Sequence, residues 1–170
     1  SLWDKGGLGS DPDLLRVQAA NFFIAYLGVD AQVTGNRLGV IHFGTSSELV
    51  VPLTLLSDAQ QRATIGERIA HPQRMGWTDP LQALEMAYDE LFLSGRSDPA
   101  HQPVIILLTD GKPELESDPT PQEKATYIEA LRAQVELFRQ RGCPIFTVAL
   151  SNEATDADPD IQTCLLYTSP

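Results

Sequence analysis

The sequence predicts a three-layer α/β fold, in which helices cover both faces of a doubly wound, mostly parallel β-sheet. Short apolar runs of strand length alternate with longer segments whose apolar residues recur at helical spacing. The clearest run is VIILLT at residues 104–109, which is typical of a strand buried on both faces of a parallel sheet. With 170 residues, the chain is long enough for one domain with a sizeable core.

Residues 10–28 predict the first helix. Ser10 or Asp11 can cap its start, and Pro12 suits its first turn. Apolar residues at helical spacing predict the face that packs on the sheet, which consists of Leu15, Ala19, Phe22, Phe23 and Tyr26.

Two apolar runs follow, LGVIHF at residues 38–43 and ELVVPLT at residues 48–54, and the short link between them predicts a β-hairpin. Pro52 lies inside the second run and has no N–H for a ladder hydrogen bond, so this strand should lie at an edge of the sheet. Residues 57–70 predict a weaker helix with Ser57 as its cap.

The second half of the chain predicts two helices and two buried strands. Residues 121–141 predict a long helix that begins with Thr120 and Glu123 at capping-box spacing. The run PIFTVAL at residues 144–150 predicts a buried strand like that at 104–109. Residues 79–93 predict a strong helix, with one apolar side formed by Leu81, Leu84, Ala87, Tyr88 and Leu91.

The charge balance limits the classes of partner. The chain has 23 acidic and 12 basic residues, for a formal net charge of −11. Nucleic-acid binding depends on Lys and Arg, so this charge argues against nucleic acid and against an anionic membrane surface. A surplus of carboxylates suits cations or basic partners. No apolar run reaches the ~18 residues of a membrane helix, so we expect no membrane insertion in this segment.

Asp110 directly follows the apolar run at residues 104–109 and precedes Gly111. In open α/β sheets, ligands bind at the carboxyl ends of the strands, so Asp110 lies where a ligand is expected. An Asp-Gly turn is the alternative explanation. Thr78 precedes the helix at residues 79–93, where it could bind a ligand or cap the helix.

Four segments in this order resemble the von Willebrand factor type A domain family: DPDLLRVQAANFFIAYLG, NRLGVIHFG, GWTDPLQALEMA and VIILLTDGKP. The resemblance extends from Asp11 to about Leu150. It implies a Rossmann-like, mostly parallel sheet with one antiparallel edge strand. It also implies a metal-ion-dependent adhesion site on top of the sheet, at which a partner protein's carboxylate often completes the coordination of Mg²⁺ or a similar cation.

The resemblance gives Thr78 the role of the metal-binding threonine and Asp110 that of the third-loop aspartate. Asp79 would assist by hydrogen bonding or by capping the helix. Hydroxyl and carboxylate oxygens suit the hard cation Mg²⁺, and Mn²⁺ or Ca²⁺ are the other candidates.

The family's first loop should supply an Asp-x-Ser-x-Ser motif, but SLWDKGGLGS stands there. Asp4 and Ser10 are the candidate ligands in this stretch, although Gly6 and Leu8 occupy the two serine positions counted from Asp4. The apolar strand that precedes this loop in the family, between the strands at 38–43 and 104–109, is also missing. We therefore expect these strands to lack ladder partners and the natural protein to extend further upstream.

We expect residues 1–10 to be a degenerate or truncated first-loop segment, residues 11–162 a type A domain truncated at both ends, and residues 163–170 a foreign tail. The expected function is a protein-binding module that uses a divalent cation to engage an acidic residue of its partner. A degenerate domain with a metal-independent structural or interaction role is the alternative.

An enzymatic role is disfavoured. A hydrolase or phosphotransferase using Asp110 is the weakest reading, because neither matched loop contains a histidine and no Gly-x-Ser-x-Gly is present. Localisation stays open, with an extracellular, cell-surface or periplasmic site favoured over the cytoplasm.

Overall fold

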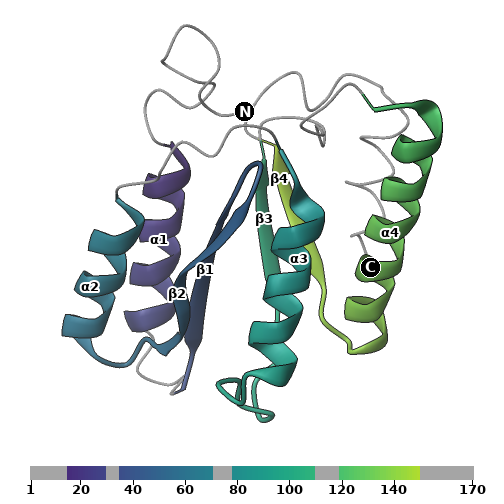
Figure 1. Cartoon of the computed structure of the whole chain (residues 1–170). Coiled ribbons are helices and arrows are strands. Elements are labelled where there is room, and N and C mark those ends of the chain that lie inside the picture. Colours follow the sequence, from purple (N-terminus) through teal and green to yellow (C-terminus); the bar gives the residue numbers. More distant parts are fainter. Residues whose placement is uncertain (1–14, 30–34, 71–77, 110–118, 150–170) are drawn as a thin grey trace, which may run out of the picture.

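The computed structural model describes residues 15–29, 35–70, 78–109 and 119–149. Helices and strands alternate along the chain and form the predicted α/β arrangement (Figure 1). The elements are α1 (Leu15–Val29), β1 (Arg37–Phe43), β2 (Ser47–Leu55), α2 (Ala59–Ile69), α3 (Pro80–Tyr88), the π-helical turn η1 (Asp89–Leu93), β3 (Ile105–Thr109), α4 (Pro121–Gln140) and β4 (Ile145–Ala149).

The described strands form two separate pairs. β1 and β2 are antiparallel, which confirms the predicted hairpin, and β3 and β4 are parallel in the register Ile105↔Ile145 to Thr109↔Ala149. In the part of the chain that the structure describes, β1 pairs with β2 alone and β3 with β4 alone. Within these described ranges, no ladder joins β1 to β3.

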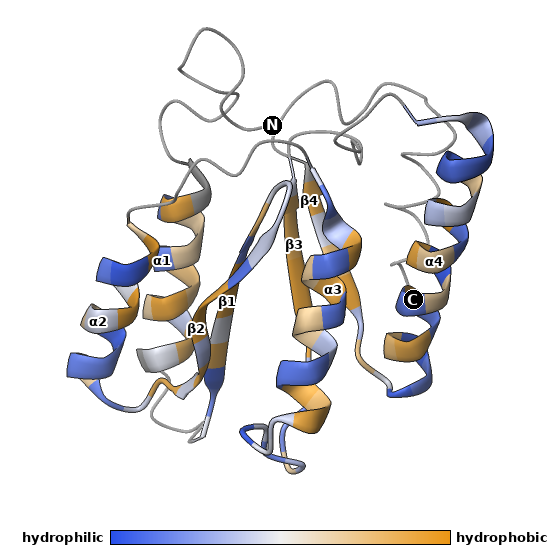
Figure 2. Ribbon diagram, viewed as in Figure 1, coloured by the Kyte–Doolittle hydropathy of each residue, from blue (hydrophilic) through white to orange (hydrophobic). Residues whose placement is uncertain are grey.

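Helices pack on each pair of strands and produce two hydrophobic clusters. One joins α1 and α2 to the hairpin, and its buried members are Ile24, Val51, Leu56, Ile65 and Ile69. The other joins α3 and α4 to the parallel pair, and its buried members are Leu84, Leu131, Phe138, Cys143 and Ile145. Colouring by hydropathy shows hydrophobic β3 and β4 beside an α4 whose outer side is hydrophilic (Figure 2).

The predicted packing face of α1 is wrong in part. Phe22 and Tyr26 are 67% and 70% exposed and stack on each other, whereas Ile24 is buried. Between Ala19 and Leu27, Asn21 is the only polar residue, so apolar side chains surround this stretch of the helix. Periodicity could not select the buried face, because both faces are apolar.

The cap of α2 also differs from the prediction. Asp58, rather than Ser57, is the N-cap, and its carboxylate accepts a hydrogen bond from the Gln60 N–H at 2.6 Å. Both residue types cap helices, so composition alone could not place the boundary to within one residue. The capping box of Thr120 and Glu123 at the start of α4 is confirmed.

The strand at residues 104–109 is buried on one face only, contrary to expectation. Ile105 and Leu107 pack into the cluster with α3 and α4, whereas Ile106 is 40% exposed. Phe146 and Val148 of β4 are 49% and 41% exposed. The two described helices of this cluster cover only one face of the parallel pair, so alternate side chains of β3 and β4 are left exposed.

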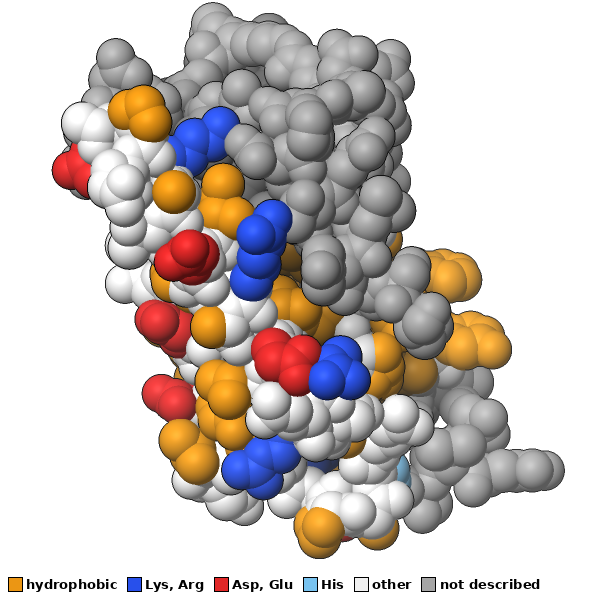
Figure 3. All heavy atoms as spheres, turned by 90° about the vertical axis from the view of Figure 1, so that its right-hand side faces the viewer, with side chains coloured by type: hydrophobic (Ala, Val, Ile, Leu, Met, Phe, Trp, Pro, Cys, Tyr) orange, Lys and Arg blue, Asp and Glu red, His pale blue; other side chains and the backbone are white. Residues whose placement is uncertain are grey.

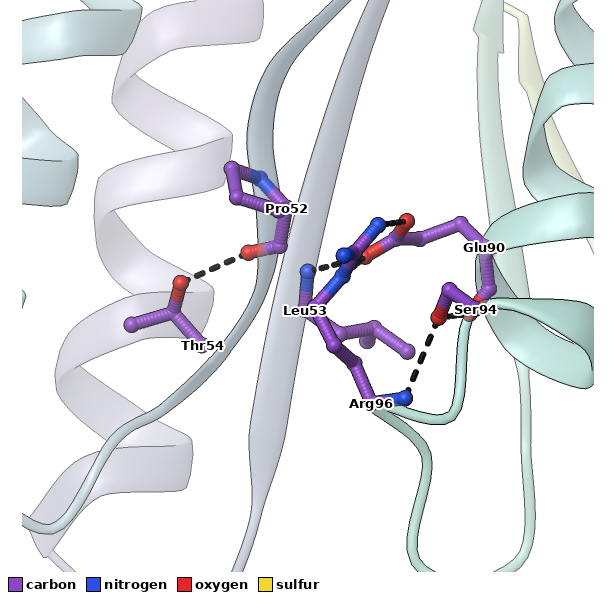
Figure 4. Close-up of polar contacts among 6 residues, drawn as sticks. All are labelled: Pro52, Leu53, Thr54, Glu90, Ser94 and Arg96. Carbon is purple, nitrogen blue, oxygen red and sulfur yellow. Dashed lines mark hydrogen bonds and ion pairs between the residues drawn. The ribbon is translucent and has the colours of Figure 1, made fainter.

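Pro52 lies where the β1–β2 ladder is irregular. The register passes from Leu38↔Thr54 to Val40↔Val51, which marks a bulge or irregularity beside the proline. The next residue, Leu53, donates its backbone N–H to Glu90 Oε1 at 2.6 Å (Figure 4). A side chain from η1 therefore satisfies a strand amide at the irregular position.

Glu90 is held on both carboxylate oxygens and is only 5% exposed. Arg96 Nε donates to Oε1 at 2.6 Å, and Arg96 Nη2 donates to Oε2. The hydrogen bond from Arg96 is the main cause that lowers the pKa of Glu90 below 4.5; burial opposes this effect, and the Leu53 N–H and the charge of Arg96 add to it. Glu90 therefore joins β2, η1 and the following loop as a carboxylate.

Glu90→Gln should lower the free energy of unfolding at pH 7 by about 1–3 kcal/mol, because a buried group loses a charged partner. We expect a loss near the lower end of this range, because the Arg96 side chain is 46% exposed and solvent weakens its interaction with Glu90. A lowered pKa stabilises the fold above pH 4.5, and this contribution disappears as pH falls through the folded-state pKa.

Urea unfolding of the unaltered protein and of Glu90→Gln between pH 7 and pH 2 measures the difference in their free energies of unfolding. This difference should shrink as the pH falls. A difference independent of pH would contradict an ionised Glu90 in the folded state. Glu85→Gln, at an exposed position of α3, is the matched control and should change stability by less than about 0.5 kcal/mol.

Candidate metal centre

Thr78 and Asp79 directly precede α3, whose first turn lies at the upper end of the strands in Figure 1. Asp79 is the N-cap: its Oδ1 accepts a hydrogen bond from the Leu81 N–H at 3.1 Å, and Pro80 occupies the first turn. Thr78 is 8% exposed and lies one residue before the cap. Helix capping therefore accounts for Asp79 and not for Thr78.

Asp79 also connects three elements. Its backbone N–H donates to Gly44 O, in the β1–β2 turn, at 2.9 Å. The hydroxyl of Tyr127, in α4, donates to Asp79 Oδ1 at 2.9 Å. The turn, the start of α3 and the first part of α4 are thus fixed to one residue beside Thr78.

No local sequence pattern predicts the contact between Tyr127 and Asp79. Tyr127 and Asp79 are 48 positions apart, and a tyrosine on an amphipathic helix reads as part of the apolar face. The signal that could have indicated the contact is the position of Tyr127 in the second turn of α4, at the end where the strands finish.

Thr109 is the last residue of β3 and is 7% exposed. Asp110 is the next residue in the sequence. Asp110, Asp4 and Ser10 all lie outside the described residues. Of the predicted ligands, the structure describes Thr78 and the supporting residue Asp79.

The remaining described residues offer no rival metal site. Among them, no group of three or more His, Cys, Asp or Glu side chains could hold a metal ion. Burial raises the pKa of the Cys143 thiol to about 11, so this cysteine is protonated at neutral pH and is a poor metal ligand or nucleophile. The donors available near α3 are oxygen atoms, which suit a hard cation.

Helices packed on two pairs of strands define an α/β domain, and in open α/β sheets ligands bind at the carboxyl ends of the strands. The chain belongs to the von Willebrand factor type A domain family, whose family model matches residues 14–163. This match confirms the resemblance inferred from the sequence segments. Domains of this family are generally protein-interaction modules and are mostly non-enzymatic.

One solved structure shows a similar fold, and a second match is weaker. Proximal thread matrix protein 1 of the mussel byssus, described with a zinc-occupied MIDAS motif, is 18% identical with a TM-score of 0.58; the match covers 92% of this chain and 35% of that one. A von Willebrand factor type A protein from Catenulispora acidiphila is 20% identical with a TM-score of 0.46, covering 91% of this chain and 39% of that one.

This chain thus spans well under two thirds of either structure. A search of curated proteins found no match. Within the described residues, no helix is both long and apolar enough to cross a bilayer.

The Asp79–Tyr127 hydrogen bond should be measurable as a coupling. Asp79→Ala should lower the free energy of unfolding by about 1 kcal/mol through loss of the cap, and Tyr127→Phe by about 1 kcal/mol through loss of the hydrogen bond. Because the two groups are in contact, their effects should not add. The double variant should lose less stability than the two single variants lose together, by at least about 0.5 kcal/mol.

Chemical denaturation of the four proteins measures this cycle. Tyr26→Phe, which removes an exposed hydroxyl from α1, is the control for the tyrosine change and should be additive with Asp79→Ala. Additive losses for Asp79 and Tyr127 would mean that the contact contributes nothing to stability.

Proposed function

We propose that this domain binds a partner protein through a divalent cation held at the carboxyl edge of its strands. The observation that carries the proposal is Thr78, a buried threonine beside an aspartate that performs the capping itself. Thr78 and Asp110 are the proposed protein ligands, with Mg²⁺ as the preferred ion and Mn²⁺ or Ca²⁺ as alternatives. Asp4 and Ser10 are further candidates from the first loop.

The contacts of Asp79 favour an indirect role in this site. One of its carboxylate oxygens already accepts hydrogen bonds from the Leu81 N–H and the Tyr127 hydroxyl. Asp79 therefore fixes the backbone next to Thr78 through these bonds. A cation with few protein ligands keeps coordination sites for water or for a carboxylate of the partner.

The outer face of α4 is a poor candidate for the partner-binding surface, which favours the edge of the strands. Acidic and basic side chains alternate over the face shown in Figure 3, with scattered apolar residues between them. A mixed surface of this kind is typical of a solvated helix face. Among the described side chains of this face, an acidic partner residue would find no basic patch, whereas a bound cation would attract it directly.

The second candidate function is metal-independent protein binding. It is favoured by the first-loop segment, in which Gly6 and Leu8 stand where Asp-x-Ser-x-Ser would place its serines. We further infer that the domain acts outside the cytoplasm, because domains of this family are often extracellular or periplasmic.

Asp110→Ala in the full-length protein should weaken Mg²⁺ binding at least about tenfold, equivalent to about 1.4 kcal/mol, because a carboxylate ligand is lost. Thr78→Ala should weaken it less, since a hydroxyl is a neutral ligand. Isothermal titration with MgCl₂ and MnCl₂ measures both effects.

Asp89→Ala, an exposed aspartate in η1 at the far end of α3, is the matched control and should bind as the unaltered protein does. If Asp110→Ala binds Mg²⁺ with unchanged affinity, the cation site is elsewhere. If the unaltered full-length protein binds neither ion, metal-independent binding becomes the better account.

A further inference from the structure

The β1–β2 turn is attached to the first turn of α3 by two hydrogen bonds. Gly44 O accepts the N–H of Asp79 at 2.9 Å. Gln82 Oε1 accepts the N–H of Ser47 at 2.6 Å. The oxygen is the only acceptor in an amide side chain, so this bond also fixes the orientation of the Gln82 amide. The turn is therefore bound to α3 on both sides, by residues one and four positions after Thr78.

The start of α4 shows what a side chain at the third helical position does elsewhere in this chain. Glu123 occupies that position, and its Oε2 accepts the N–H of the N-cap, Thr120, at 2.8 Å. This bond is one half of the capping box, and it satisfies an N–H group at the helix start. Glu123 therefore serves its own helix.

Gln82 occupies the third position of α3 but does not bind its own N-cap. The N–H of the N-cap, Asp79, donates to Gly44 O, and the Gln82 oxygen accepts the Ser47 N–H. The two groups that would bind each other in a capping box are thus both bound to the β1–β2 turn. Helix capping does not account for Gln82, whose hydrogen bond instead fixes where the turn lies.

The location of the turn determines the location of Thr78. Thr78 is buried and directly precedes Asp79, so the bond to Gly44 O holds the peptide group that joins the two residues. Thr45 and Ser46, at the tip of the turn, are exposed, so burial of their side chains contributes little to holding the turn. If the turn shifted, this peptide group and the Thr78 side chain would shift with it.

We propose that Gln82 is a positioning residue of the cation site and acts on Thr78 through the β1–β2 turn. This inference rests on the proposed function, in which Thr78 is a ligand of the cation. Groups that orient metal ligands typically change metal affinity by about tenfold or more when they are removed. Gln82 acts through the backbone of the turn, so we expect its loss to weaken Mg²⁺ binding about three- to tenfold.

Amide hydrogen exchange, resolved to single residues by mass spectrometry, tests the contact in the full-length protein with EDTA present. Gln82→Met preserves the length of the side chain but removes its acceptor, and should speed exchange of the Ser47 N–H at least about threefold. Gln82→Glu retains an acceptor oxygen and should preserve the protection of this amide. Unchanged Ser47 exchange in Gln82→Met would overturn the proposal.

Isothermal titration with MgCl₂ tests the effect on the cation site. Gln82→Met should weaken Mg²⁺ binding about three- to tenfold. Gln60→Met, the same substitution at an exposed position in the first turn of α2, is the matched control and should not change it. Because Gln82 acts through Thr78, Thr78→Ala and the double variant of Thr78→Ala with Gln82→Met should bind Mg²⁺ with the same affinity.

The possible outcomes separate this inference from the proposed function. If the unaltered protein binds neither Mg²⁺ nor Mn²⁺, the proposed function fails and this inference fails with it. If the unaltered protein binds Mg²⁺ and Gln82→Met binds it with equal affinity, the positioning role alone is overturned. An equal loss of affinity with and without the Thr78 hydroxyl would also overturn it, because Gln82 would then act by a route other than Thr78.

Discussion

Helix α3 holds the two pairs of strands together. It packs on β1 and β2, and its residue Leu84 is buried in the cluster that α4 and β4 complete. Its N-terminus is capped by Asp79, which is bonded to the β1–β2 turn and to α4, and it continues into η1, where Glu90 is bonded to β2. In the described residues the two pairs share no ladder, so these contacts of α3 and η1 take the place of strand pairing as the connection between them.

The sequence was sufficient to predict the helices and strands whose local signals agree with their packing. Pro80 at the start of α3 and the capping box at Thr120 marked helix starts, and the apolar side of α3 is the side that packs. The pairing of β1 with β2 followed from a short link between two apolar runs. Each of these predictions depends on residues close together in the chain. Over such short distances, the spacing of residues along the sequence determines which side chains share a face.

The errors and omissions arise where several arrangements satisfy the same pattern. Apolar residues surround α1, so its exposed pair, Phe22 and Tyr26, could not be distinguished from its buried face. The contacts of Tyr127 with Asp79 and of Glu90 with Leu53 join positions 48 and 37 residues apart. Neither has a local signature, because a polar atom's distant partner depends on how the elements pack.

The π-helical turn η1 has a consequence for how the chain can change in length. Such a turn contains one more residue than an α-helix needs, and it rotates the side chains that follow it. Deleting one residue after Glu90 within η1 would restore a regular helix but rotate the chain that follows, and would turn Arg96 away from Glu90. The loop from Ser97 to Val104, before β3, has no buried residue. Insertions and deletions among related sequences should therefore accumulate after Arg96 and stop abruptly at the helix before it.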